Sequence, residues 1–195
     1  GRWVTKRAVK QIAKWEEKNM EKRNISINFS PDQLNDIAYV GFLDNLIKKE
    51  NIDPSLLEIE ITESILLESK EESIQFLNKL KKLGVNIVLD DFGKGYSSFS
   101  YLTFIPADKV KLDKSLNDQF ISANTNDDNN DTIDSLISLI HSLGLKVVAE
   151  GIEDIERCKK LKNGKCDLIQ GYLCSKPIDL RGIEKIYYKN FLDEI

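Results

Sequence analysis

The sequence is poor in the residues that build zinc sites and disulfide frameworks. It has one histidine and three cysteines, and no two cysteines have Cys-x-x-Cys spacing. This composition disfavours a structural zinc site and a set of disulfides. No apolar run approaches the roughly 20 residues that span a bilayer, and no signal-peptide pattern opens the chain. We therefore expect a cytoplasmic domain with no direct membrane contact of its own, although a larger parent protein could be membrane-anchored.

The sequence also lacks an excess of basic residues. Its net charge is −4, which argues against a nucleic-acid polymer as partner. With 195 residues, of which 41% are hydrophobic, it is long enough for one globular domain with a substantial core. A helical pattern begins almost at Gly1, without a cap before it, which predicts that the chain is cut from something longer.

Short apolar strands alternate with amphipathic helices along the chain. The predicted strands are Ile25–Asn28, Leu57–Ile61, Val85–Asp90, Lys109–Leu112, Lys146–Glu150 and Leu168–Gln170. The predicted helices are Pro31–Lys49, Lys70–Leu83, Thr132–Leu143 and Asp154–Leu161. The polar segment Ser122–Asp131 is interpreted as a surface loop. Such alternation favours an α/β fold with a parallel sheet and helices outside it.

A polar residue follows an apolar neighbour at or near the end of each predicted strand. The six are Asn28, Glu60, Asp90, Lys111, Glu150 and Gln170. Because side chains alternate along a strand, the apolar neighbour faces the helices and the polar residue faces inward. This layout is typical of a TIM-like (βα) barrel, which needs eight strands. We therefore predict one domain over residues 1–195, an incomplete barrel that lacks its first two strands.

The strand ends also offer oxygen ligands for a hard divalent cation. Asn28, Glu60, Asp90 and Asp91 suit Mg²⁺ or Mn²⁺, and two such ions would stabilise a phosphoryl displacement. Lys111 is suited to hold a bound water or a phosphate, and Glu150 to act as general base. A response-regulator receiver domain also pairs two acids with a lysine. It would also need a third, phospho-accepting aspartate on a strand between Asp90 and Lys111, and the 21 residues that separate these two leave no room for such a strand.

Motifs in a fixed order resemble those of the EAL domain family of cyclic di-GMP phosphodiesterases. They read INFS at 27–30, EIEITES at 58–64, DDFGKGYSSFSYL at 90–102, KLD at 111–113, AEGIE at 149–153 and QGYLCSKP at 170–177. The resemblance covers essentially the whole chain. It implies hydrolysis of cyclic di-GMP to linear pGpG with Mg²⁺ or Mn²⁺ at a two-metal site. The substrate, cyclic di-GMP, is the small-molecule partner that it implies.

The same resemblance assigns a role to each candidate residue. Metal ligands would be Asn28, Glu60, Asp90 and Asp91, and the catalytic residues would be Glu150, Lys111 and Gln170. Glu153 would be a substrate-side acid, and Glu63 would anchor the loop Phe92–Ser98. That loop, with Phe99 and Tyr101 after it, predicts a homodimer interface. Sensory or cyclase domains are the partners expected in the same polypeptide.

One family feature has no counterpart. No Glu-Ala-Leu tripeptide occurs in the sequence, so the metal-binding glutamate that names the family is absent. Fewer carboxylate ligands bind a hard cation more weakly, so we expect poor Mg²⁺ binding and slow or no hydrolysis by these 195 residues alone. Two alternatives stay open: a cyclic di-GMP receptor that does not hydrolyse it, and a dimerising scaffold without a ligand.

Overall fold

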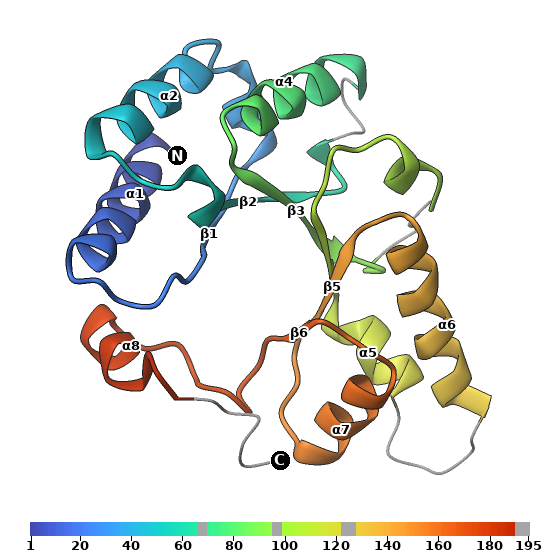
Figure 1. Ribbon diagram of the computed structural model, residues 1–195. Coiled ribbons are helices and arrows are strands. Elements are labelled where there is room, and N and C mark those ends of the chain that lie inside the picture. The colour runs from blue at the N-terminus through green and yellow to red at the C-terminus, as the bar shows by residue number, and fades with distance from the viewer. Residues whose placement is uncertain (66–69, 95–98, 122–127, 190–195) are drawn as a thin grey trace. The chain divides into compact units, whose positions relative to one another are not determined.

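The computed structural model describes residues 1–65, 70–94, 99–121 and 128–189 (Figure 1). They divide into two compact units. The first comprises Gly1–Asp90 and Ser98–Asp108, and the second comprises Asp91–Ser97 and Lys109–Ile195. No helix in the described ranges combines the length and the apolar character that crossing a membrane requires.

The first unit is built on three parallel strands. In chain order its elements are α1 (Arg2–Glu17), β1 (Ile25–Asn28), the 3-10 helix η1 (Pro31–Asn35), α2 (Tyr39–Glu50), the 3-10 helix η2 (Pro54–Leu56), β2 (Leu57–Thr62), α4 (Lys70–Lys82), β3 (Asn86–Phe92) and the 3-10 helix η3 (Phe99–Thr103). The last two residues of β3 belong to the second unit. Figure 1 shows α1 beside α2, and α1 also packs against β1. The apolar residues of β2, including Ile59 and Ile61, are fully buried.

The second unit repeats the alternation of strand and helix. Its elements are β4 (Lys109–Leu112), α5 (Lys114–Phe120), α6 (Asp128–Ser142), β5 (Lys146–Ala149), α7 (Ile155–Asn163), β6 (Leu168–Ile169) and α8 (Leu180–Ile186). β5 pairs in parallel with β4 on one side and with β6 on the other. Val110, Val147 and Ala149 are fully buried, so the core of this unit lies along β4 and β5.

The sequence pattern predicts most of these elements, with two corrections. The single helix predicted over Pro31–Lys49 is wrong, because η1 ends at Asn35 and α2 begins only at Tyr39. Between them Asp36 accepts two hydrogen bonds from the Arg2 guanidinium, which ties this turn to α1. The loop predicted over Ser122–Asp131 is wrong in its last part, because α6 already begins at Asp128. Residues 122–127 lie outside the described ranges.

An aspartate anchors the beginning of one strand in each unit. Asp108 accepts a hydrogen bond of 2.8 Å from the Ile87 backbone N–H on β3, and Lys81 on α4 donates to both its carboxylate oxygens. In the second unit Asp167 accepts one of 2.8 Å from the Val147 N–H on β5. His141 Nε2 on α6 lies 2.8 Å from the same carboxylate oxygen.

The same order of glycine and strand recurs around these anchors. Gly84, with φ 91°, lies between α4 and β3, and Gly144, with φ 78°, lies between α6 and β5. Both occupy the left-handed region that glycine enters without a steric penalty, as expected after the last turn of a helix. At the other end of the strands, Asp91, the second-last residue of β3, has φ 58°, and Gly151, two residues after β5, has φ 69°. The two helix–strand segments therefore both have a residue with positive φ near each end of the strand.

Asp53 holds together the turn that leads into β2. Its carboxylate caps η2 by accepting from the Ser55 backbone N–H at 3.1 Å, and it forms an ion pair of 2.8 Å with Lys22. The hydrogen bonds from Lys22 and Ser55 lower the pKa of Asp53 from 3.8 to about 2. A carboxylate with a lowered pKa stabilises the folded state above the pKa of the unfolded chain. This contribution is lost as the pH falls from about 4 to 2.

We expect Asp53→Ala to lower the free energy of unfolding by about 1 kcal/mol at pH 7, since it removes both the cap and an exposed ion pair. Asp53→Asn is the matched control, because an asparagine also caps a helix start and only the charge is lost. Urea denaturation at several pH values measures both. The gap between the wild type and each variant should narrow below pH 4, and a gap that widened there would contradict the assignment.

Candidate functional site

Three predicted site residues of the first unit lie at the carboxyl ends of adjacent strands. Asn28, the last residue of β1, is in register with Glu60 on β2. Asp90 on β3 is in register with Thr62, two residues beyond Glu60 on the same strand. Residues in register or two apart project from the same face of a parallel sheet. Asn28, Glu60 and Asp90 therefore share one face, as the sequence predicts.

The acidic residues of β2 differ in their surroundings. Glu60 is 9% exposed, and Glu58, two residues nearer the start of the strand, is 5% exposed. Glu58 accepts hydrogen bonds from Asn24 at 2.5 Å and from Ser26 at 2.8 Å, so it belongs to the packing of β1 on β2. Glu63 follows β2 in a turn. The loop that it is predicted to anchor lies partly outside the described residues, so that role stays a prediction.

An ion pair joins two predicted catalytic residues of the second unit. Lys111 Nζ lies 2.8 Å from Glu150 Oε1, and the two side chains are only 6% and 16% exposed. Lys111 is on β4, and Glu150 directly follows β5, where its backbone N–H donates to the Leu112 carbonyl. Burial makes such a pair sensitive to the loss of either partner, because the remaining charge would be left in a poorly solvated place.

Asp91 adds a second carboxylate beside this pair. A carboxylate oxygen of Asp91 and one of Glu150 lie within 4.8 Å of each other. Lys94 Nζ approaches Asp91 at 3.1 Å from the exposed side. Asp91 and Glu150 form an acidic group. Its carboxylates are the oxygen donors that hard cations prefer, so it could bind a metal ion.

The other two candidates of the second unit lie at its edge. Gln170 follows β6 and is exposed; its backbone N–H donates to Ala149 and its carbonyl accepts from Ile152. Gly171 lies so close to the turn after β5 that an added Cβ would be 2.0 Å from the Ile152 carbonyl oxygen. Glu153 is exposed and forms an ion pair of 2.5 Å with Lys114 on α5.

Sequence reasoning missed a buried amide next to the ion pair. Asn117 on α5 is fully buried, and its Nδ2 donates to the carbonyls of Leu112 and Glu150, at 2.9 Å each. The signal available in the sequence was the start of α5, where Asp113 caps the helix by accepting from the Ser115 N–H. Nothing in the sequence pattern distinguishes Asn117 from an exposed asparagine of a helix.

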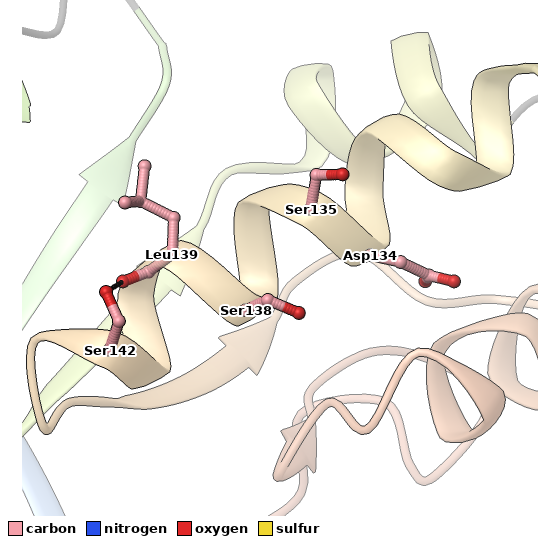
Figure 2. A pocket seen from close by; sticks show the side chains of 5 residues that line it. All are labelled: Asp134, Ser135, Ser138, Leu139 and Ser142. Carbon is pink, nitrogen blue, oxygen red and sulfur yellow. Dashed lines mark hydrogen bonds between the residues drawn. The ribbon is translucent and has the colours of Figure 1, made fainter.

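A surface hollow of the second unit lies away from the strand ends, along α6. It is lined by Asp134, Ser135, Ser138, Leu139 and Ser142. Figure 2 shows these side chains along the helix, with the Ser142 hydroxyl bonded to the carbonyl of Leu139 at 2.6 Å. The hollow contains none of the residues predicted from the motifs, and we do not include it in the candidate site.

Comparison with known proteins identifies the family. The model of the EAL domain matches residues 1–177, and the chain belongs to this family. The predicted fold class is confirmed: an α/β fold of the TIM-like barrel type, with six described strands. A solved structure titled as the PaMucR phosphodiesterase in complex with c-di-GMP matches with a TM-score of 0.82 and 31% identity, over 94% of this chain and 73% of that one.

Curated relatives are much longer than this chain. The signaling protein YkoW of Bacillus subtilis is 34% identical over 91% of this chain and 22% of its own length. The cyclic di-GMP phosphodiesterase PdeR of Escherichia coli is 32% identical over 98% of this chain and 28% of its own length. The chain thus spans less than a third of either relative.

We expect Lys111→Met to lower the free energy of unfolding by about 2–4 kcal/mol in the presence of a chelator, because it leaves the Glu150 carboxylate unpaired in a buried place. The double variant Lys111→Met/Glu150→Gln should recover part of this loss, since no charge then remains. Lys159→Met, at an exposed position of α7, is the control and should change stability by no more than about 0.5 kcal/mol. Urea denaturation giving Lys111→Met the same stability as this control would refute the structural role of the ion pair.

Proposed function

We propose that this chain takes part in the metal-dependent hydrolysis of cyclic di-GMP to linear pGpG. The observation that carries the proposal is the ion pair of 2.8 Å between Lys111 and Glu150, with the Asp91 carboxylate beside it. A base and a cation held together at the ends of adjacent strands suit the activation of a water molecule. Relatives named cyclic di-GMP phosphodiesterases support the choice of substrate.

The donor set fits Mg²⁺ or Mn²⁺. Its members are carboxylates and one amide, which hard cations prefer to the imidazole and thiolate ligands of zinc. We assign Asn28, Glu60 and Asp90 to one metal and Asp91 to a second. Two bound ions would polarise a phosphoryl oxygen of the substrate and make a water molecule easier to deprotonate.

Glu150 serves as the general base in this proposal. It removes a proton from the attacking water, whose oxygen forms a new bond to phosphorus while the bond to one ribose 3′ oxygen breaks. That 3′ oxygen takes up a proton, so opening the ring consumes one water. A base must be ionised before it acts, and Lys111 Nζ places a positive charge 2.8 Å from the Glu150 carboxylate.

The remaining residues have supporting roles. We assign Gln170 to the water cluster beside the metals and Glu153 to the substrate side. Glu153 lies at an exposed position, which suits contact with a ligand that enters from solvent. Glu63 is proposed as the anchor of the loop Phe92–Ser98.

The wider context of the domain is also a proposal. We expect it to act in the cytoplasm as a homodimer, next to sensory or cyclase domains of the same protein. Tyr101, predicted to lie at the dimer interface, is half-buried within the first unit, and residues 95–98 lie outside the described ranges. Light scattering tests the dimer directly, and a monomer at high concentration would count against it.

Binding and turnover measured side by side test the function. We expect the protein at its natural length to bind cyclic di-GMP and, with Mg²⁺ or Mn²⁺, to release pGpG, identified by its mass and by chromatography against a standard. Binding without product would favour the non-hydrolysing receptor. The absence of both would leave the dimerising scaffold and overturn the proposal.

We expect Glu150→Gln to reduce turnover by roughly 10²–10⁴, the usual contribution of a general base, and to leave substrate binding largely unchanged. Glutamine keeps the size of the side chain and removes the charge. Glu156→Gln, at an exposed position in the first turn of α7, controls for the loss of one negative charge nearby. If Glu150→Gln retained the turnover of Glu156→Gln, another residue would have to be the base.

A further inference from the structure

Asn117 contacts the backbone next to both members of the ion pair between Lys111 and Glu150. Its Nδ2 donates at 2.9 Å to the carbonyl of Leu112, the residue after Lys111, and at 2.9 Å to the carbonyl of Glu150 itself. One amide group therefore bridges the end of β4 and the residue after β5. The side chains of the ion pair extend from these two places.

The bridge is not needed to pair the Leu112 carbonyl. The Leu112 carbonyl already accepts the backbone N–H of Glu150 at 3.0 Å, so the ladder between β4 and β5 closes without Asn117. The Asn117 Oδ1 is also buried and has no hydrogen-bond partner in the part of the chain that the structure describes. Burial of an unsatisfied amide oxygen is unfavourable, and an apolar side chain would avoid that cost. Packing alone therefore does not explain an asparagine at this position.

The first turns of α5 brace the same region at two further points. Gly151, directly after Glu150, lies so close to Lys114 that an added Cβ would be 2.5 Å from its Cγ. Gly93, two residues after Asp91, lies so close to Leu116 that an added Cβ would be 2.2 Å from its Cδ1. Both glycines have positive φ. The helix thus presses on the turns that follow both carboxylates of the acidic group.

We propose that Asn117 is a positioning residue that fixes the Glu150 carboxylate relative to Lys111 for catalysis. The inference rests on the proposed function, in which Glu150 is the base. Asn117 does not touch the substrate in this scheme and acts only through the backbone of Glu150. Its loss allows the turn after β5 to shift, and a displacement of a catalytic group by about 1 Å is enough to cost up to roughly 10²-fold in rate.

The test is a double-mutant cycle in the protein at its natural length. Asn117→Leu keeps the branched shape and removes the amide, and Asn117→Asp keeps the size but places a carboxylate against two carbonyls. We expect either variant to lower kcat about 10-fold to 10²-fold with KM nearly unchanged, rates being corrected for the folded fraction. In a Glu150→Gln background the same substitutions should change kcat by less than about 2-fold, because residues that act as a unit are not additive.

A control at the other end of β5 separates positioning from stability. Asp167 holds the start of this strand through the Val147 N–H, at the opposite end from Glu150. Asp167→Asn should lower stability and leave kcat of the folded protein unchanged. If Asn117→Leu instead lowered kcat by the same factor with and without Glu150, or caused no loss, the positioning role would be overturned.

A crystal structure of Asn117→Leu provides an arm that needs no activity. We expect Glu150 to move from its contact of 2.8 Å with Lys111. If the contact were unchanged, the inference would fail even if the protein hydrolysed cyclic di-GMP. If the wild type showed no hydrolysis, the proposed function would fail, while the crystal structure would still decide whether Asn117 holds Glu150.

Discussion

Parallel pairing is the constraint from which the candidate site follows. It places the carboxyl ends of adjacent strands at one edge. Backbone pairing alone therefore makes neighbours of residues that are far apart in sequence. In the first unit the register sets Asn28 beside Glu60, and in the second it brings Lys111 within reach of Glu150. The apolar residues that precede the polar ones on these strands, such as Ile59 and Val110, are buried. They fix the register, because a slip by one residue would expose them.

Within the second unit, parallel pairing brings a lysine and a glutamate together, and a helix holds the backbone that carries them. A lysine and a glutamate withdrawn from water must keep close contact, or their attraction does not offset the loss of hydration. The strands alone leave the residue after β5 in a turn, where Gly151 has a positive φ. The short helix α5 supplies the missing rigidity, since its first turns meet this turn through both an amide and a packed side chain. This seven-residue helix therefore contacts the backbone of both residues that follow Lys111 and β5.

The sequence predicted the strands well, because each is a short apolar run with a polar residue at its end. Ile25–Asn28 and Lys109–Leu112 have the predicted bounds. It failed where tertiary contacts decide: the turn at Asp36 depends on Arg2 of another helix. The site residues could be proposed because they belong to motifs. Asn117 could not, since its partners are backbone carbonyls of two strands, and no residue pattern records them.

Positions 91 and 151 have the same backbone conformation but different residues, and the residue that is better for folding stability at position 91 is not the one that supplies a carboxylate. Both residues have a left-handed conformation, but one is an aspartate and the other a glycine. A side chain at such a position is strained, so glycine is the residue that folding alone would select. Selection for thermal stability, whether by directed evolution or computational redesign, would therefore favour replacement of Asp91 by glycine. It would gain a more robust scaffold and lose the carboxylate next to Glu150.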